Sequence, residues 1–194
     1  MSVSPVIGAS DHYARAELVT LGAQDGAPVL LDRRRVELIG KGLPTAPYHH
    51  EALEMELPQA SELVEAVRRS VAEHARSSVS IMIEAYDPGA LILPTSPYDS
   101  LPESLEDVLA SRPLTNAADG MLYRECLADA ARELGLKVHR YPRKSDPIQL
   151  AAEAMKVDVA EVNALIAGFG REAGSPWRKD HKLAAAAALS VLGA

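Results

Sequence analysis

Apart from His74, which lies within a predicted helix, four histidines in this sequence stand beside an acidic residue or another histidine. They occur in three short strings: Asp11-His12, His49-His50-Glu51 and Asp180-His181. Carboxylate oxygen and neutral imidazole nitrogen are the ligands that Zn²⁺, Mn²⁺ and Fe²⁺ take in proteins. The three strings are therefore the first places to look for metal-dependent chemistry.

Each string also has a purely structural interpretation. Asp11 follows Ser10 at a strand end, where aspartate commonly forms a turn. Asp180 stands where a helix begins, and the helix dipole favours an acid there. His49 and His50 would point to opposite faces of a strand, so they could bind one ion only on an irregular backbone. Solvated or hydrogen-bonded loop histidines are the alternative.

Three strands joined by tight turns are predicted near the N-terminus. The apolar run Pro5–Ala9 is short, and Tyr13–Leu21 alternates apolar with polar residues, which is typical of a strand. Val29–Ile39 is the third strand. Asp25-Gly26 lies between the second and third strands, and both residue types tolerate the positive φ of a hairpin turn. The pattern predicts an antiparallel meander.

An irregular connection rich in Gly and Pro, Gly40–Pro58, leads from the meander to a long helix. We expect Ser61 to cap this helix, which runs to Tyr86 with apolar residues near the 3.6 period. Ala90–Leu93 is then a short buried strand. The remaining prediction is a strand at Lys137–Tyr141, a turn at Gly168-Phe169-Gly170-Arg171, and helices at Glu103–Ala110, from Asn116 or Asp119 to Leu134, at Pro147–Lys156, Val159–Gly168 and Trp177–Leu192.

This order of elements resembles the ribonuclease H-like fold, to which Holliday junction resolvases, integrases and many nucleases belong. Two strings add to the resemblance. Val6-Ile7-Gly8-Ala9-Ser10-Asp11 is similar to the first strand of that fold with its aspartate, and Lys179-Asp180-His181-Lys182-Leu183-Ala184-Ala185-Ala186 is similar to the closing resolvase helix. The resemblance implies an α/β fold: a ribonuclease H-like mixed five-stranded sheet, three antiparallel strands then two parallel, flanked by helices, in a single domain over residues 1–194.

The resemblance also implies a site. Nucleases of this fold hold two Mg²⁺ ions with carboxylates from the first strand, the fourth strand and the last helix. Asp11 would supply the first carboxylate and Asp180, beside His181, the last, so these three are the candidate catalytic residues. With His12 they are the candidate ligands for Mg²⁺ or Mn²⁺, and we expect Asp11 and Asp180 on the same side of the sheet. The fourth strand supplies no acid before Asp99.

The distribution of charge along the sequence indicates whether nucleic acid could be a binding partner. The formal net charge is −7, which argues against a surface that is basic throughout. Residues 137–194 nevertheless carry 9 basic and 6 acidic side chains, so a basic C-terminal patch for nucleic acid is a hypothesis. A homodimer is a further hypothesis about the partners of this protein. The basic group comprises Arg140, Arg143, Lys144, Arg178, Lys179 and Lys182.

Two features that the sequence lacks, a membrane-spanning run and a pair of cysteines, indicate the cellular compartment that we expect. No run approaches the roughly 20 apolar residues of a membrane-spanning helix, so no membrane partner is expected. Cys126 is the only cysteine, which excludes a disulfide within the chain and suits a reducing cytoplasm.

The incomplete set of carboxylates favours a cytoplasmic protein with a ribonuclease H-like fold that is non-catalytic or a degenerate nuclease. The alternative is a metal-dependent nuclease or phosphodiesterase acting on nucleic acid. A third hypothesis is a metal-dependent hydrolase that uses the loop histidines.

Overall fold

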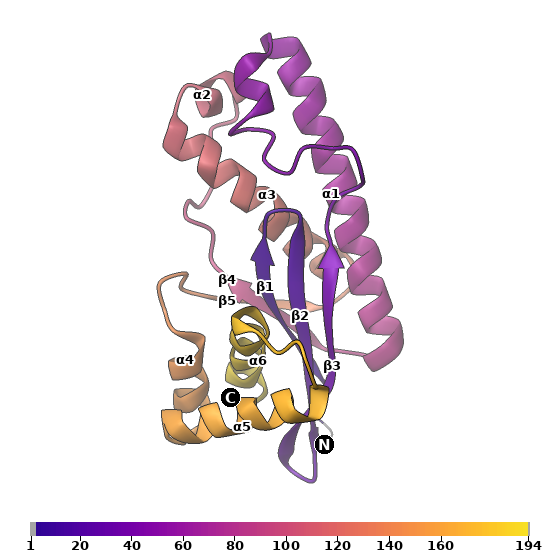
Figure 1. Cartoon of the computed structure of the whole chain (residues 1–194), viewed down its shortest axis with the longest axis vertical. Helices are drawn as coiled ribbons and strands as arrows, with labels where there is room; N and C mark the ends of the chain where they lie inside the picture. The colour runs from indigo at the N-terminus through magenta and orange to yellow at the C-terminus, as the bar shows by residue number, and fades with distance from the viewer. Residues whose placement is uncertain (1–2, 194) are drawn as a thin grey trace.

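The computed structural model describes residues 3–193 and contains a five-stranded mixed sheet in the order β3-β2-β1-β4-β5 (Figure 1). β1, β2 and β3 pair antiparallel, whereas β1, β4 and β5 pair parallel. This arrangement confirms the sheet predicted from the ribonuclease H-like resemblance. The strands are β1 (Val6–His12), β2 (Arg15–Gln24), β3 (Ala27–Glu37), β4 (Ala90–Pro94) and β5 (Lys137–Tyr141).

Two tight turns set the antiparallel half of the sheet. Asp25 and Gly26 connect β2 to β3 with φ values of 53° and 81°, as the hairpin signal predicted. Ala14, with φ of 67°, lies in the turn between β1 and β2. The predicted pairing of Tyr13–Leu21 with Val29–Ile39 is confirmed, and β1 lies centrally between β2 and β4.

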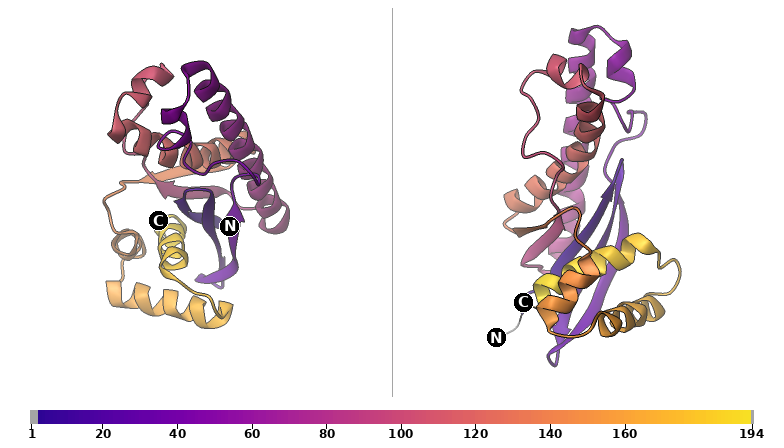
Figure 2. Two further views of the ribbon diagram at one scale, coloured as in Figure 1. Left: turned by 45° about the horizontal axis from the view of Figure 1, so that its top comes forward. Right: turned by 90° about the vertical axis from the view of Figure 1, so that its left-hand side faces the viewer.

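Helices cover both faces of the sheet. α1, α2 and α3 lie on one side, and α4, α5 and α6 lie on the other (Figure 2). No helix in residues 3–193 is long and apolar enough to cross a membrane. The helices are the 3₁₀ turn η1 (Glu51–Glu54), α1 (Leu57–Tyr86), α2 (Leu105–Leu109), α3 (Arg112–Glu133), α4 (Pro147–Met155), α5 (Val159–Ala173) and α6 (Lys179–Leu192).

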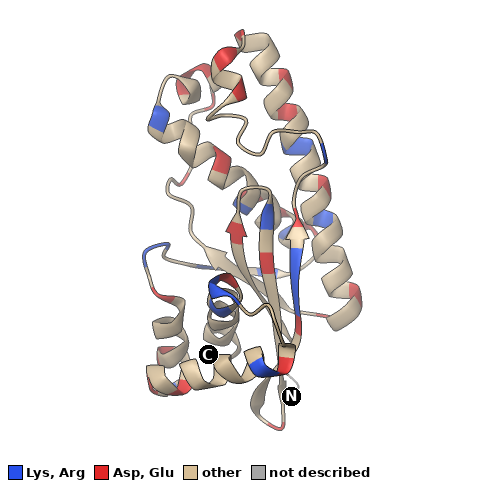
Figure 3. Ribbon diagram, in the orientation of Figure 1, with Lys and Arg blue, Asp and Glu red and all other residues tan. Residues whose placement is uncertain are grey.

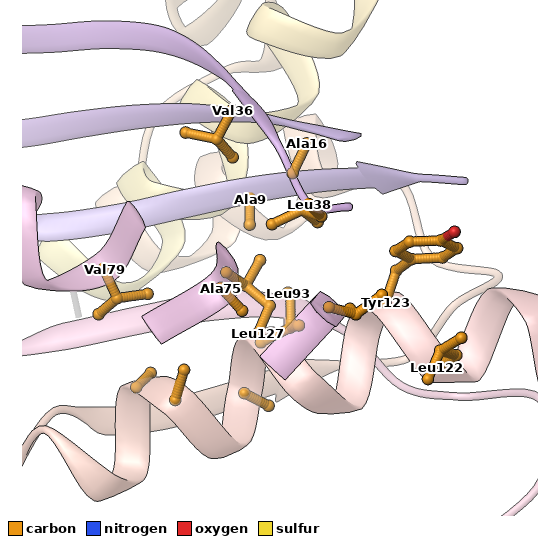
Figure 4. Packing of buried hydrophobic residues seen from close by; sticks show 14 of the residues in the cluster. Ala9, Ala16, Val36, Leu38, Ala75, Val79, Leu93, Leu122, Tyr123 and Leu127 are labelled. Atoms are coloured by element: carbon orange, nitrogen blue, oxygen red, sulfur yellow. The ribbon is translucent and has the colours of Figure 1, made fainter. Parts of the chain in front are cut away.

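Side-chain alternation along β1 decides which helix each residue meets. Ile7 and Ala9 belong to the core beneath α1 and α3, part of which is drawn in Figure 4. Val6 belongs to the core beneath α6, and a Cβ on Gly8 would point at the backbone of α6. Because successive strand residues face opposite sides, Asp11 continues the α3 side and His12 the α6 side.

Small residues let α6 lie directly on β1. A Cβ added to Gly8 would stand 1.9 Å from the carbonyl oxygen of Ala184. The run from Ala184 to Ala188 is fully buried against the sheet. The predicted alanine-rich closing helix is confirmed. Its first turn lies beside the carboxyl end of β1.

Three sequence-based boundaries are wrong. α1 begins at Leu57 and not after Ser61, because Pro58 suits the first helical turn and Ala60 is already in the core. α3 begins at Arg112, with a proline in its first turn, well before Asn116. The segment Gly168-Phe169-Gly170-Arg171 is helical within α5, since Phe169 is buried and Trp177 packs on Gly170.

Asp119 is a buried tie between α3 and the irregular connection. Its Oδ1 and Oδ2 accept the backbone N–H groups of Tyr48 and His49 at 3.1 and 3.0 Å. Burial raises the pKa of Asp119 to about 6, although the two hydrogen bonds act to lower it. Asp119, one of the two predicted start residues of this helix, instead lies inside α3 and holds the irregular connection in place.

Candidate functional site

Asp11 lies at the carboxyl end of β1 and forms an ion pair with Arg124 of α3. Arg124 Nε is 3.2 Å from Asp11 Oδ1, and Arg124 Nη2 is 2.9 Å from Oδ2. The two side chains are only 4% and 12% exposed, and Arg124 Nη1 also donates to the carbonyl oxygen of Thr95 at 3.2 Å. Both carboxylate oxygens of Asp11 are thus committed to one guanidinium group, a strong bidentate geometry.

His12, at the end of β1, and Asp180, in the first turn of α6, are in contact on the face of the sheet that α6 covers. His12 Nε2 lies 3.1 Å from Asp180 Oδ2, and both side chains are partly exposed. The carboxylates of Asp11 and Asp180, which we expected on the same side of the sheet, therefore have different partners. The reason is the alternation along β1, which directs adjacent side chains to opposite faces.

His181 fixes the first turn of α6 on the sheet. Its Nδ1 accepts the backbone N–H of Arg178 at 3.1 Å, and its ring stacks on Trp177 with centroids 5.5 Å apart. Its Nε2 lies 3.2 Å from Oε2 of Glu17 on β2. Burial lowers the pKa of His181, opposed by the charge of Glu17.

Glu17 is a buried acid that the sequence analysis missed. It is 7% exposed and stands opposite Ser10 in the β1–β2 register. The signal available in the sequence was a lone acid between Ala16 and the apolar residues that follow it in β2. Its neighbour in space, His181, is remote in the sequence.

The donors do not fit the pair of Mg²⁺ ions that the fold resemblance implies. Within residues 3–193 no group of three or more His, Cys, Asp or Glu side chains is placed to hold a metal ion. Hard cations need several oxygen ligands in a small volume, yet Asp11 is neutralised by Arg124 and Asp180 faces His12. The assignment of Asp11, Asp180 and His181 as catalytic, and of these with His12 as metal ligands, stays a prediction.

The histidine loop does not assemble a metal site either. The rings of His49 and His50 meet edge to face with centroids 4.8 Å apart. The nearby carboxylate, Asp119, already accepts two backbone N–H groups. Among the described residues, His49, His50 and Glu51 do not form a group placed to hold a metal ion.

A cavity of about 550 Å³ opens at the carboxyl ends of β1, β4 and β5. Ligands of open α/β sheets commonly bind outside the carboxyl ends of the strands. We call this cavity the basic pocket, since four basic and two acidic side chains line it. Its lining is Ser10, Asp11, Pro94, Arg124, Tyr141, Arg143, Ser145, Asp146, Pro147, Ile148, Lys179, Lys182 and Leu183.

The acids of the basic pocket are already in use. Asp11 pairs with Arg124, and Asp146 Oδ1 accepts the N–H of Ile148 at the start of α4. In contrast, Arg143, Lys179 and Lys182 form no ion pair with a described residue. Figure 3 shows the basic loop after β5 facing the start of α6. The pocket therefore presents uncompensated positive charge.

Three other arginines do not extend the basic pocket into a continuous patch, because acidic side chains compensate their charges. Arg140 binds Glu125 and the carbonyl oxygen of Pro94, so its charge is compensated. In the Arg33-Arg34-Arg35 run, Arg34 and Arg35 pair with acids on their own strand. Of the C-terminal basic group, Arg143, Lys179 and Lys182 line the basic pocket, whereas the charge of Arg140 is compensated outside it.

Comparisons with solved structures identify the fold. RuvC from Thermus thermophilus superposes with a TM-score of 0.55 and 16% identity over 96% of this chain and 92% of that one. The same RuvC in complex with a Holliday junction substrate gives 0.52 and 16% over 96% and 91%. The yeast mitochondrial Holliday junction resolvase Ydc2 gives 0.52 and 15% over 99% and 78%.

No protein-family model matches the sequence, and no curated protein is similar to it in sequence. The likeness to the resolvases is therefore one of structure, spread over nearly the whole chain. In strand order, helix placement and extent, this protein has the ribonuclease H-like fold of the RuvC and Ydc2 Holliday junction resolvases.

Proposed function

We propose that this protein binds nucleic acid and holds a backbone phosphate in the basic pocket. The observation that carries the proposal is the convergence of Arg143, Lys179 and Lys182 without carboxylate partners. Phosphate contacts by Lys and Arg supply most of the affinity for nucleic acid. The solved complex of RuvC with a Holliday junction supports a branched DNA as the first ligand to test.

The local geometry favours an anion over a cation. Lys179 and Lys182 are in the first turn of α6, whose backbone N–H groups add a positive dipole end. Arg143 faces them from the loop after β5, and its own backbone N–H is held by Thr95 Oγ1 at 3.1 Å. Because the whole chain has a net charge of −7, this pocket is a local binding site and not part of a surface that is basic throughout.

The function proposed is binding without two-metal cleavage, as in a degenerate nuclease. Two-metal hydrolysis needs carboxylates that are free to coordinate, and Asp11 is held by a buried guanidinium. The second candidate is a metal-dependent nuclease. The resolvase fold and the contact between His12 and Asp180 favour it, and Mn²⁺, which accepts nitrogen ligands, would support it before Mg²⁺.

The double variant Lys179→Gln/Lys182→Gln will bind a fluorescein-labelled four-way DNA junction about 10-fold more weakly than the wild type at low salt. Each lost phosphate contact also lowers the slope of log K against log salt by about 1. The measurement is fluorescence anisotropy at a series of salt concentrations.

Lys137→Gln is the matched control, because Lys137 is exposed at the amino end of β5, opposite the basic pocket. It will leave both affinity and slope unchanged. Equal binding by the double variant and the wild type would reject the basic pocket as the phosphate site.

A further inference from the structure

A second cavity, of about 390 Å³, adjoins the basic pocket. The two cavities share Asp11 and Arg124, so the buried ion pair forms the boundary between them. We call the second cavity the side pocket. Its lining is Asp11, His12, Tyr13, Arg15, Gly120 and Arg124.

The ring of Tyr13 is held in a fixed orientation within the side pocket. Its hydroxyl donates to the carbonyl oxygen of Asn116 at 3.2 Å, and its ring lies 6.3 Å from that of Tyr123 at an angle of 29°. Tyr123 is itself fully buried and donates its hydroxyl to the carbonyl oxygen of Thr45 at 2.8 Å. Tyr13 nevertheless remains 42% exposed. It is an aromatic surface that needs no rearrangement before a ligand stacks on it.

A glycine inside α3 leaves room beside this ring. Gly120 stands in the middle of a 22-residue helix, where glycine is unfavourable compared with alanine. A Cβ at this position would meet only Cε1 of Tyr13, at 3.7 Å, and no other atom within 4 Å. Packing of the protein against itself therefore does not account for the glycine. The empty space belongs to the side pocket.

We propose that the side pocket binds an unpaired base of the strand whose phosphate occupies the basic pocket. This inference rests on the proposed function and specifies its ligand as nucleic acid with single-stranded character. The base stacks on Tyr13, while Arg15 and His12 lie beside the adjoining backbone. Base stacking on aromatic side chains is independent of sequence because every base has a π face.

A duplex cannot use the side pocket in this way, since its bases are already stacked on one another. Single strands, and the strand exchange point of a branched DNA, present bases that can leave the stack at lower cost. The side pocket thus predicts a preference for unpaired over paired strands, whereas the basic pocket alone gives none.

The test compares a short fluorescein-labelled single strand, its duplex, and an abasic deoxyribose phosphate strand of the same length. Tyr13→Ala will weaken binding of the single strand about 10-fold, and Tyr13→Phe, which keeps the ring, will bind as the wild type does. Neither variant will change the affinity for the duplex. The wild type will bind the abasic strand as weakly as Tyr13→Ala binds the normal strand.

Gly120→Leu gives an independent variant with Tyr13 intact, because its side chain fills the space beside the ring. It will lose affinity for the single strand to the same extent, while Gly120→Ala will not. Equal affinity of wild-type protein for the normal and abasic strands would overturn the inference. If Lys179→Gln/Lys182→Gln still weakens binding in that case, the proposed function stands and only base stacking fails; if the wild type binds no strand at all, both fail.

Discussion

Arg124→Ala will destabilise the protein by about 3–5 kcal/mol, the usual cost of removing one partner of a buried ion pair. The substitution leaves the Asp11 carboxylate nearly buried without its guanidinium. It also removes the hydrogen bond to the carbonyl oxygen of Thr95, which connects α3 to the end of β4. Urea denaturation followed by circular dichroism measures the change.

Arg76→Ala is the matched control, because Arg76 pairs with Glu133 between α1 and α3 with both side chains more than half exposed. Exposed pairs of this kind contribute about 1 kcal/mol or less. In the Arg124→Ala background, the further change Asp11→Asn will recover part of the lost stability, since it removes the unpaired charge. A loss of less than about 1 kcal/mol for Arg124→Ala would contradict a structural role for the pair.

Gly8→Ala will cost about 3 kcal/mol or more, at the upper end of the range for overpacked cores. The new Cβ would stand 1.9 Å from the carbonyl oxygen of Ala184 and 3.0 Å from the backbone nitrogen of Ala188. Backbone atoms of a helix cannot yield as the end of a side chain can, so α6 must move off β1. Soluble yield and urea denaturation report the effect.

The control for Gly8→Ala is Gly120→Ala, a substitution of the same size in a site with room for it. The added methyl group lies at 3.7 Å from Tyr13 and favours the helix, so stability will rise by up to about 1 kcal/mol. Similar losses in the two variants would show that the packing of α6 on β1 is looser than described.

The sheet was predictable because its signals are local. Alternation along β2 and the Asp25-Gly26 turn are contained in short stretches of sequence, and they lead to the observed antiparallel pairing. The order β3-β2-β1-β4-β5 followed from the resemblance in element order. Helix starts were less predictable, since Pro58 reads equally as part of a loop and as the first turn of a helix.

The candidate site was predictable only in part, because the contacts that define it join distant residues. Asp11 and Asp180 were singled out by type, but the partner of Asp11 is Arg124, 113 residues away. Nothing local distinguishes Arg124 from any other arginine on a helix. Alternation along β1 could have predicted that Asp11 and His12 face opposite sides, and hence that Asp11 and the residue paired with His12 have different partners.

The basic residues show the same limit. Arg143, Lys179 and Lys182 were grouped by charge, and they line one pocket. Arg140 was grouped with them, yet Glu125 on α3 neutralises it. Charge counting along the sequence finds cations, whereas the three-dimensional pairing decides which of them remain free.

Binding of nucleic acid in the basic pocket is expected to occur without two-metal cleavage. The most direct test measures binding and cleavage of one labelled four-way DNA junction in the same samples, with no metal, with Mg²⁺ and with Mn²⁺. The expected result is binding without metal, binding about 10-fold weaker in Lys179→Gln/Lys182→Gln, and intact DNA after incubation with Mg²⁺. Mg²⁺-dependent cleavage by the wild type that disappears in both Asp11→Asn and Asp180→Asn would contradict it and establish a nuclease.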